Sequence, residues 1–317
     1  MRPFLKWAGG KRQLLPQLRR FYPPRFATYH EPFLGSGAVF FDLVGRGDLG
    51  ARGAVLTDEN PDLIGCYLRV RDSVDQVIGR LERLARGHTS GGADHYLRVR
   101  DERFNPRREA WRKAGGSLDA YGPDLAAMLI YLNRTGYNGL FRVNQSGGFN
   151  VPPGRYLKPR ITDADLLRQV SATLAAPGVR LSLGSFETVV DRAAAGDFVY
   201  FDPPYAPLSP TANFRSYTSR GFSDADQSRL QRVAVTLAER GVTVLLSNST
   251  APVVLELFEA DGAARAAGLR AVRVPARRAI NTRADRRGVV EELLVTNVAV
   301  QSSSLKGQRE ATTPVEL

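Results

Sequence analysis

The stretch "YHEPFLGSGAVFFDL", residues 29–43, reads as a strand, a tight turn and a helix in direct succession. An apolar segment ends near Glu31, two glycines follow at Gly35 and Gly37, and a run of apolar residues with helical spacing then begins. Glycines at such a turn let backbone amides approach a bound molecule closely. The position occupied by Phe40 would be Gly or Ala in a dinucleotide-binding fingerprint. The turn therefore favours a nucleoside without a pyrophosphate.

Other segments repeat this alternation of short apolar strands and longer helices. The segment "VLTDEN" places Asp58 at a strand end about twenty residues beyond the glycine turn, which suits an acid that binds ribose hydroxyls. Ser223 and Asp226 form a capping box before a helix that ends ahead of Gly241 and the strand "VTVLLSN". The pattern predicts an α/β fold with a Rossmann-like parallel sheet. For the glycine turn alone, an ordinary turn with exposed acids is the simpler interpretation.

The length of 317 residues predicts about two structural units. Between about 60 and 173 the strand signal fades, and helical, Arg-rich sequence replaces it, so we interpret this part as an inserted domain. Within it, "GHTSGG" and "AGGS" are typical of surface loops. The expected organisation is a catalytic domain of residues 1–59 and 174–300, a mainly helical target-recognition domain of residues 60–173, and a disordered tail of residues 301–317.

The composition predicts a basic, cytoplasmic protein without metal chemistry. Lys and Arg number 44 against 32 Asp and Glu, a net charge of +12 that attracts nucleic acid or an acidic membrane surface. No stretch reaches the roughly 18 apolar residues of a membrane span. Cys66 is the only cysteine, which excludes an intramolecular disulfide. The histidines His30, His88 and His95 lack zinc-ligand spacing.

The segment "YFDPPY" has the residues needed to hold an amino group. A strand ending at Phe201 places Asp202 at the carboxyl edge of the sheet, where open α/β folds bind ligands. Pro203 and Pro204 stiffen the next turn, so that the Asp202 carboxylate and the Pro203 carbonyl offer two acceptors side by side. Tyr205 adds a flat aromatic surface. Together these groups suit the exocyclic amino group of a planar base, although Asp-Pro pairs elsewhere are usually plain turns.

Four motifs in order along the chain resemble the Dam family of DNA adenine-N6 methyltransferases. They are "FLKWAGGK" at 4–11, "EPFLGSG" at 31–37, "NRTGYNGLFRVNQSGGFNVPPGRY" at 133–156 and "DPPY" at 202–205. Two weaker matches are "SPTANFRSY" at 209–217 and "RRAINTRADRRGVVEELL" at 277–294. The resemblance covers nearly the whole chain and also accounts for the inserted helical domain.

The resemblance implies S-adenosylmethionine as the methyl donor. The residues that it places around this cofactor are Trp7, Lys11, Glu31, Pro32, Phe33, Gly35, Ser36, Gly37, Asp58, Ser185, Phe186 and Asp202. Many relatives carry an aspartate at the position of Ser185. Without the motif around them, Trp7 would read as a core aromatic and Lys11 as a solvated surface charge.

The segment 136–156 has the composition of a β-hairpin, with two strand-like runs separated by "QSGG". Such a ribbon can enter a major groove, where Arg142 could bind guanine while Leu140 and Pro152 pack on a thymine methyl. By resemblance, Lys6 lies near the first base of the site. The DNA-binding residues expected are Lys6, Tyr137, Asn138, Leu140, Arg142, Asn144, Pro152 and Tyr156.

The expected function is methyl transfer to N6 of a flipped adenine in duplex DNA, with GATC as target. Asp202, Pro203, Pro204 and Tyr205 are the expected catalytic residues, and Tyr205 is the candidate for stacking on the flipped base. We expect a monomer that needs no metal. Two alternatives stay open at this point: a nucleic-acid-binding protein without catalysis, or methylation of cytosine N4, RNA adenine or a protein glutamine. Enzymes of the latter kinds usually carry Ser or Asn in place of Asp202.

Overall fold

The computed structural model describes residues 1–7, 11–208, 222–277 and 289–298. The strands are β1 Thr28–Glu31, β2 Gly53–Asp58, β3 Val179–Leu183, β4 Phe198–Phe201, β5 Thr243–Ser249, β6 Arg270–Arg277 and β7 Val289–Thr296. The α-helices are α1 Leu15–Leu18, α2 Ala38–Arg46, α3 Pro61–Asp72, α4 Val74–Arg98, α5 Asn105–Lys113, α6 Pro123–Thr135, α7 Ala164–Leu174, α8 Val189–Arg192, α9 Asp224–Glu239, α10 Pro252–Leu255 and α11 Gly262–Ala266. Shorter helical turns are η1 Lys11–Gln13, η2 Arg19–Phe21, η3 Val99–Phe104, η4 Leu118–Ala120, η5 Tyr137–Gly139, η6 Phe186–Thr188 and η8 Glu256–Ala260.

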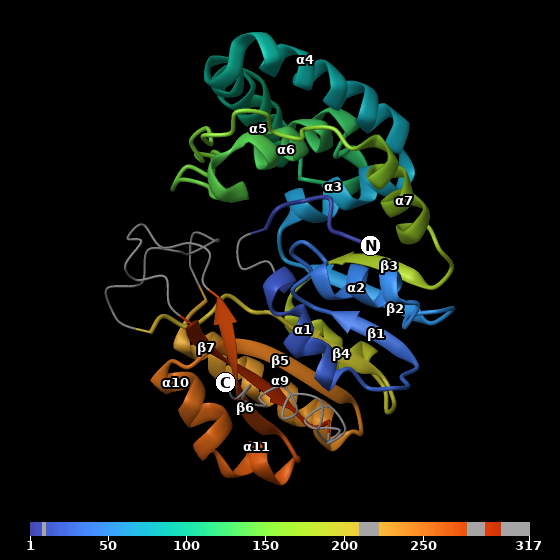
Figure 1. The fold of residues 1–317 in the computed structure, drawn as a ribbon, viewed down its shortest axis with the longest axis vertical. Helices are drawn as coiled ribbons and strands as arrows, with labels where there is room; N and C mark the ends of the chain where they lie inside the picture. The colour runs from blue at the N-terminus through green and yellow to red at the C-terminus, as the bar shows by residue number, and fades with distance from the viewer. Residues whose placement is uncertain (8–10, 209–221, 278–288, 299–317) are drawn as a thin grey trace, which may run out of the picture.

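A seven-stranded sheet with the order β3-β2-β1-β4-β5-β7-β6 forms the centre of the molecule (Figure 1). The strands β3, β2, β1, β4 and β5 are parallel, whereas β7 is antiparallel to both β5 and β6. The strand order reverses between β1 and β4, because the chain moves outward from β1 to β3 on one side and from β4 to β5 on the other. Ligands bind outside the carboxyl ends of the strands at such a reversal. The prediction of a Rossmann-like α/β sheet is confirmed.

The central strand β4 separates two hydrophobic cores. Phe198 and Tyr200 belong to one cluster, whereas Val199 and Phe201 belong to the other, because successive side chains of a strand point to opposite faces. All four side chains are buried, as expected for a strand covered on both faces. The first cluster continues into the helical region, and the second lies under α9.

The helix α9 begins and ends where the sequence predicts. The Ser223 hydroxyl accepts a hydrogen bond from the Asp226 backbone while the Asp226 carboxylate accepts one from the Ser223 backbone, so the capping box is confirmed. Gly241 has a φ of 77°, two residues beyond the last helical residue, Glu239. This left-handed conformation turns the chain directly into β5.

The helices α3 to α7 gather at one end of the molecule, beyond the sheet (Figure 1). The helix α6 lies in the middle of this group and is buried along most of its length, with α3 and α4 packed against it. Its apolar neighbours belong to the same cluster as one face of the sheet. The assignment of residues 60–173 to a separate target-recognition domain stays a prediction.

The loop predicted at "GHTSGG" is wrong, since residues 87–92 lie within α4, which kinks at Gly92 with a φ of 45°. The glycines serve close packing here. A Cβ added to Gly87 would lie 2.4 Å from the ring of His95, which returns beside it after the kink. Tyr131 packs edge-on against that ring, 5.8 Å between centres. Small residues at this position therefore let two helical segments approach.

The loop predicted at "AGGS" is confirmed, since residues 114–117 follow the end of α5 and are not helical.

Three segments named in the sequence lie wholly or mostly outside the described residues. They are the motif match at 209–217, most of the match at 277–294, and the tail at 301–317.

Candidate active site

Three acidic side chains meet at the carboxyl ends of adjacent strands. Glu31 is the last residue of β1, Asp58 is the last residue of β2, and Asp202 directly follows β4. Since β1 lies between β2 and β4, all three acids lie at the same edge of the sheet, beside the reversal of strand order. The structure thus brings together the strand-end acids that the sequence singled out.

Lys11 forms an ion pair with Asp202. Its Nζ lies 2.8 Å from Asp202 Oδ1, and only 6% of the lysine side chain is exposed. The Ser247 hydroxyl donates a hydrogen bond of 3.3 Å to the same carboxylate oxygen. The lysine Nζ also lies 4.3 Å from the centre of the Tyr205 ring, a cation–π contact. The interpretation of Lys11 as a solvated surface charge is therefore wrong.

The electrostatics of this pair are set by burial and by the neighbouring charges. Burial raises the pKa of the Asp202 carboxyl, and the Lys11 ammonium opposes that shift. For Lys11, burial alone would lower the pKa, but Asp202, Tyr205 and Glu292 act the other way and leave the pKa raised. Lys11 consequently keeps its proton at neutral pH and favours the charged, accepting form of Asp202.

The segment after Asp202 is anchored by residues that sequence reasoning missed. The Tyr205 hydroxyl donates a hydrogen bond of 2.7 Å to Glu292 on β7. The side-chain amide of Gln227 on α9 donates a hydrogen bond of 3.2 Å to the Pro204 carbonyl. These two bonds fix both the aromatic ring and the preceding turn.

The end of β5 supplies a second anchor. The Ala206 amide donates a 3.2 Å hydrogen bond to the Asn248 side chain, and the Ser249 hydroxyl donates one of 2.6 Å to the Ala206 carbonyl. Both polar side chains are buried. The signal that could have revealed them is the polar run "SNST" that ends an otherwise apolar strand.

The glycine turn between β1 and α2 is held to the end of β2. Gly35 and Gly37 have φ values of 47° and 65°, which L side chains rarely adopt. The Gly35 amide donates a 3.0 Å hydrogen bond to one oxygen of Asp58, and the Asn60 amide donates a 2.9 Å bond to the other. A Cβ on Gly35 would lie 2.9 Å from the Trp7 ring, so glycine is needed for the close approach. Asp58 therefore braces this turn in addition to any role toward a ribose.

Glu31 is buried beneath the turn with few compensating charges. Its Oε2 accepts hydrogen bonds from the Tyr29 hydroxyl at 2.9 Å and from the Phe40 amide at 3.1 Å. Burial nevertheless raises the pKa of Glu31 to about 8, against the effect of both bonds. Burial likewise raises the pKa of Asp58 to about 6. A cationic group brought between these acids would relieve the cost of their charges.

A cluster of three phenylalanine rings lies next to this edge of the sheet. The rings of Phe33 and Phe186 stack with 5.2 Å between centres and 20° between planes, and Phe222 packs at an angle to both. Ser185 precedes Phe186 and caps the turn η6, where its hydroxyl accepts a hydrogen bond from the Glu187 amide.

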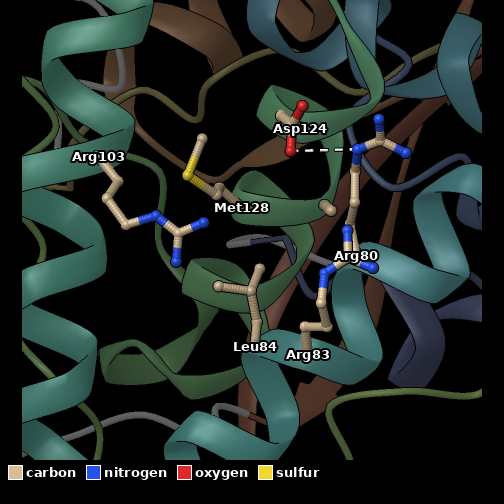
Figure 2. Close-up of a pocket in the computed structure, with 7 residues that line it drawn as sticks. Arg80, Arg83, Leu84, Arg103, Asp124 and Met128 are labelled. Atoms are coloured by element: carbon tan, nitrogen blue, oxygen red, sulfur yellow. Dashed lines mark ion pairs between the residues drawn. The ribbon is translucent and has the colours of Figure 1, made fainter.

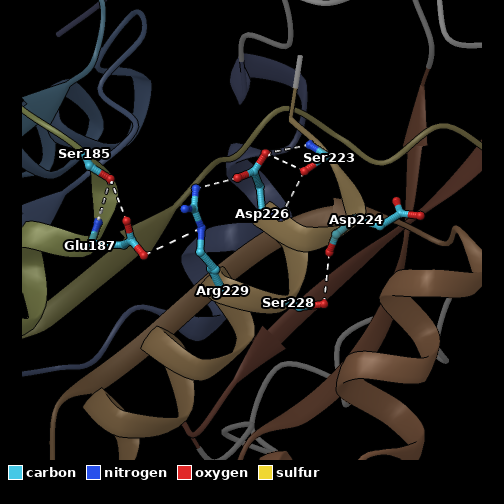
Figure 3. A network of polar contacts seen from close by, with 7 residues as sticks. All are labelled: Ser185, Glu187, Ser223, Asp224, Asp226, Ser228 and Arg229. Carbon is cyan, nitrogen blue, oxygen red and sulfur yellow. Dashed lines mark hydrogen bonds and ion pairs between the residues drawn. The ribbon is translucent and has the colours of Figure 1, made fainter. Parts of the chain in front are cut away.

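A polar network fixes that turn to α9 (Figure 3). Glu187 lies 3.7 Å from Arg229, which also bonds Asp226 of the capping box. The Ser185 hydroxyl is thus engaged in hydrogen bonds with Glu187 in its own turn.

The N-terminal segment joins the glycine turn to the helical region. The Trp7 ring approaches Gly35 and stacks on Phe141, with 5.9 Å between ring centres and 20° between planes. The Lys6 amide donates a 2.8 Å hydrogen bond to the Asn133 side chain on α6. Trp7 therefore contacts both the predicted cofactor loop and the predicted hairpin.

The predicted hairpin is short and mostly irregular. A turn closes between Asn144 and Gly148, followed by one antiparallel bridge between Val143 and Phe149 and a further bridge between Gly136 and Pro153. The expected DNA-binding residues that are exposed on this segment are Tyr137, Arg142, Asn144, Pro152 and Tyr156. Those that are partly buried are Lys6, Asn138 and Leu140.

Several of these residues already have partners within the chain. Arg142 donates a hydrogen bond of 2.8 Å to the Asn150 side chain across the hairpin. The Lys6 ammonium lies 4.0 Å from the centre of the Tyr156 ring, and burial lowers the pKa of Lys6. Asn138 has a φ of 53°, the left-handed conformation that asparagine tolerates better than most residues.

Two cavities lie away from the strand ends. One of about 150 Å³ lies between α4, η3 and α6 and is lined mainly by Arg80, Arg83, Arg103 and Asp124 (Figure 2). The other, of about 370 Å³, lies beside the N-terminus and α2. Neither is lined by any of the strand-end acids.

In the described part of the chain, no three His, Cys, Asp or Glu side chains form a group that could hold a metal ion. Among the helices of these same residues, none has the length and apolar character needed to cross a bilayer.

The fold and the strand-end site define an α/β protein with acidic side chains gathered at the reversal of its strand order. Comparison of sequences makes this class specific, because the D12 class N6 adenine-specific DNA methyltransferase family matches residues 7–272. The chain belongs to this family and is therefore an adenine-specific DNA methyltransferase by class.

Individual relatives agree with this membership. The chain is similar to the type II methyltransferase M1.LlaDCHI of Lactococcus lactis subsp. cremoris, with 38% identity over 94% of this chain and 95% of the relative. It is also similar to the DNA adenine methylase of Escherichia coli K12, with 36% identity over 92% of this chain and 94% of the relative. The resemblance to the Dam family is confirmed. Among solved structures, the rRNA methyltransferase AviRa of Streptomyces viridochromogenes aligns over 90% of this chain and 82% of its own, with 13% identity and a TM-score of 0.33.

Proposed function

We propose that this protein transfers a methyl group from S-adenosylmethionine to N6 of a flipped adenine in duplex DNA, with GATC as its target, and that it acts as a monomer. The observation that carries the proposal is the Asp202, Lys11 and Tyr205 group at the strand reversal. It offers a carboxylate acceptor beside an aromatic ring, at the place where open α/β sheets bind ligands.

The described residues fit the proposed cofactor. Gly35 leaves no room for a Cβ at a backbone that carries a left-handed φ, as expected where a ligand must approach the chain closely. The buried acids Glu31 and Asp58 have raised pKa values that a cationic ligand would lower again. S-adenosylmethionine carries such cations in its ammonium and sulfonium groups, and its sulfonium supplies the methyl group. Phe33 is only partly buried and offers an apolar ring for the adenine of the cofactor, with the buried Phe186 ring stacked against it.

The chemistry of the acceptor follows from the groups at Asp202. The lone pair of adenine N6 is delocalised into the ring, which makes this nitrogen a poor nucleophile. Hydrogen bonds from its two N–H groups to the Asp202 carboxylate and the Pro203 carbonyl favour a pyramidal nitrogen with a localised lone pair. The Lys11 ammonium favours the charged form of the carboxylate, and the fixed positions of these groups supply orientation before the reaction starts.

A base within a duplex cannot reach these acceptors unless it leaves the stack. Tyr205 is placed to stack on the extruded adenine, and its bond to Glu292 holds the ring in one orientation. The ring of Tyr137, 44% exposed on the hairpin, is the candidate for filling the space left in the duplex. Both assignments belong to the proposal of base flipping.

Sequence choice is assigned to the exposed residues of the hairpin. Arg142 must exchange its bond to Asn150 for one to guanine, which the exposed position of its side chain allows. The target GATC is inferred from the resemblance to the Dam family of DNA adenine methyltransferases.

The alternatives make different use of the same site. A binding protein without catalysis would have no need of a buried Lys11–Asp202 pair, which costs desolvation. Methylation of cytosine N4, RNA or protein is disfavoured by Asp202, since enzymes of those kinds usually carry Ser or Asn there. The intact pair therefore favours adenine in DNA.

Methylation mapping tests the proposal. Genomic DNA without prior adenine methylation is exposed to the enzyme and S-adenosylmethionine, and the modified adenines are located by sequencing, with tritium transfer to RNA and protein measured in parallel. We expect N6-methyladenine in GATC. A dominant motif that lacks GATC would refute the target, and labelling of RNA or protein alone would refute the class of substrate.

A further inference from the structure

The second arm of the hairpin lies against one face of the helical segment that contains η3 and α5. Alternate residues of this arm, Gly147, Phe149 and Val151, turn their backbone groups toward that segment. The bonds that join them are Arg108 to the Gly147 carbonyl, Asn105 to both the amide and the carbonyl of Phe149, and Arg100 with Tyr96 to the Val151 carbonyl.

These side chains replace a missing neighbouring strand. An unpaired strand edge leaves its N–H and C=O groups without partners. In the hairpin, the inner edge of the second arm pairs with the first arm, for example through the bond of 3.1 Å from the Asn150 amide to the Arg142 carbonyl. The outer edge pairs with the helical side chains instead. The register of the arm is therefore set from both sides.

Arg108 is the most firmly held of these side chains. Its Nε lies 2.8 Å from each carboxylate oxygen of Asp62, and the side-chain exposures of the two residues are 8% and 0%. The guanidinium carbon lies 5.8 Å from the centre of the Phe141 ring, on the first arm. If Arg108 left this position, the buried Asp62 carboxylate would lose its compensating charge. Arg108 is therefore held in place and fixes the position of the hairpin turn.

Asp62 in turn belongs to the first turn of α3, close to the end of β2. Its amide donates a 3.0 Å hydrogen bond to the side chain of Asn60, whose own amide binds Asp58. The hairpin turn is thus connected through Arg108 to the loop that carries the strand-end acid. This gives Arg108 a structural role within the Arg-rich sequence of residues 60–173.

We propose that Arg108 is a positioning residue for sequence recognition. It sets the register of the hairpin through Gly147 and so directs Arg142, on the opposite arm, toward its base pair. The proposal rests on the proposed function, because it takes the hairpin as the part that reads DNA.

The test compares a double variant at Asp62 on α3 and Arg108 on α5 with a single variant at Asn105 on α5. The double variant Asp62→Leu/Arg108→Met removes both buried charges together and keeps apolar volume, and Asn105→Ala removes the bonds to Phe149 without touching a charge. Arg107→Met is the matched control. Arg107 is exposed on α5, and its ion pair with Asp124 is a long, exposed contact of 3.8 Å. Each protein is first checked for a cooperative thermal transition and for its dissociation constant for S-adenosylmethionine.

Two readouts follow. Amide hydrogen exchange of residues 144–150 should become at least about 10-fold faster in the double variant and faster in Asn105→Ala, with the control unchanged. The ratio of kcat/KM for the wild-type target to that for a target altered at the base pair read by Arg142 should fall about 10-fold or more, within the range for one bidentate contact. Cofactor affinity should stay within about twofold of the wild type, because no replaced residue lines that site.

A folded double variant with unchanged exchange and unchanged discrimination would overturn the proposal. If the double variant does not fold, Asn105→Ala decides by the same two readouts. If the wild type methylates no DNA, the proposed function fails, while hydrogen exchange still reports whether Arg108 fixes the hairpin.

Discussion

Asp202 combines two demands in one side chain. In the proposed mechanism it must stay charged to accept hydrogen bonds from an amino group, yet it lies at a partly buried strand end where burial raises its pKa. Lys11 meets the first demand at 2.8 Å, and the Ser247 hydroxyl adds a bond to the same oxygen. The other carboxylate oxygen is then the natural acceptor for the substrate.

Replacing Asp202 tests whether its carboxylate is the acceptor for the substrate amino group. We expect Asp202→Ala to lower kcat by about 10²–10³ or more, because it removes a fixed acceptor that acts at the reacting nitrogen. The measurement is single-turnover methyl transfer to a short duplex, with cofactor binding determined separately. Asp119→Ala, at an exposed position on η4, serves as the control. Near-normal turnover by a folded Asp202→Ala enzyme would contradict the mechanism.

Glu31 makes stability depend on pH. The folded protein holds a proton on this carboxyl up to about pH 8, whereas the unfolded chain releases it near its ordinary value of 4.5. Between these values the folded state binds more protons, so the free energy of unfolding falls as the pH rises, by at most about 1.4 kcal/mol per pH unit from this group.

The isosteric replacement Glu31→Gln should therefore flatten the pH dependence. Its amide oxygen can still accept the bonds from Tyr29 and Phe40, while the titration is removed. Urea unfolding of the protein without cofactor, between about pH 5.5 and 7.5, gives the two slopes. The exposed Glu239→Gln should keep the wild-type slope, and an equally steep fall in Glu31→Gln would show that Glu31 titrates normally.

The acids of the site could be predicted from sequence because each one follows an apolar strand. That local pattern places Glu31, Asp58 and Asp202 at one edge of a parallel sheet without knowledge of any contact. The bond from Tyr205 to Glu292 could not be predicted this way, since it depends on β7 inserting between β5 and β6. Local periodicity carries no information about such a pairing.

At the scale of elements, sequence signals were reliable where the chain itself sets the conformation. The capping box of α9 and the turn between β1 and α2 depend on neighbouring residues alone. The glycines of residues 87–92 were misleading, because Gly87 is small to admit the His95 ring from another part of α4. Glycine thus marks a turn between β1 and α2 and a close tertiary contact within α4.

The glycine turn gives a prediction with an internal control. Gly35→Ala should weaken S-adenosylmethionine binding by about 10-fold or more, because the added Cβ meets the Trp7 ring at 2.9 Å and distorts the turn. Gly47→Ala has a left-handed φ of 78° at the other end of α2 but no atom within 4 Å of the added Cβ. Both variants carry backbone strain of about 1–2 kcal/mol. Isothermal titration calorimetry should separate them, and equal affinities would exclude a cofactor role for the Gly35 turn.

At the scale of the whole molecule, the net charge of +12 governs association with DNA. Each phosphate neutralised by Lys or Arg releases counterions, so log Kd should rise with log salt concentration by about 0.9 per contact. Fluorescence anisotropy of a labelled duplex across a range of salt concentrations measures the slope. Binding that does not respond to salt would contradict a charge-driven interface. Activity should also survive a chelator, since the proposed chemistry uses no metal.

Lys6 and Lys11, near the start of the sequence, complete their contacts only when distant parts of the chain exist. Lys6 binds Asn133, and Lys11 binds Asp202, which lies 202 − 11 = 191 positions later. At a synthesis rate of roughly 5–20 residues per second, about 10–40 s separate the appearance of the two partners of that ion pair on the ribosome. The bond from Tyr205 to Glu292 becomes possible last, because Glu292 is the latest of these residues to be synthesised. We therefore expect a nascent chain to remain inactive toward DNA until residue 292 has been synthesised, and chains terminated before that residue to lack methyltransferase activity.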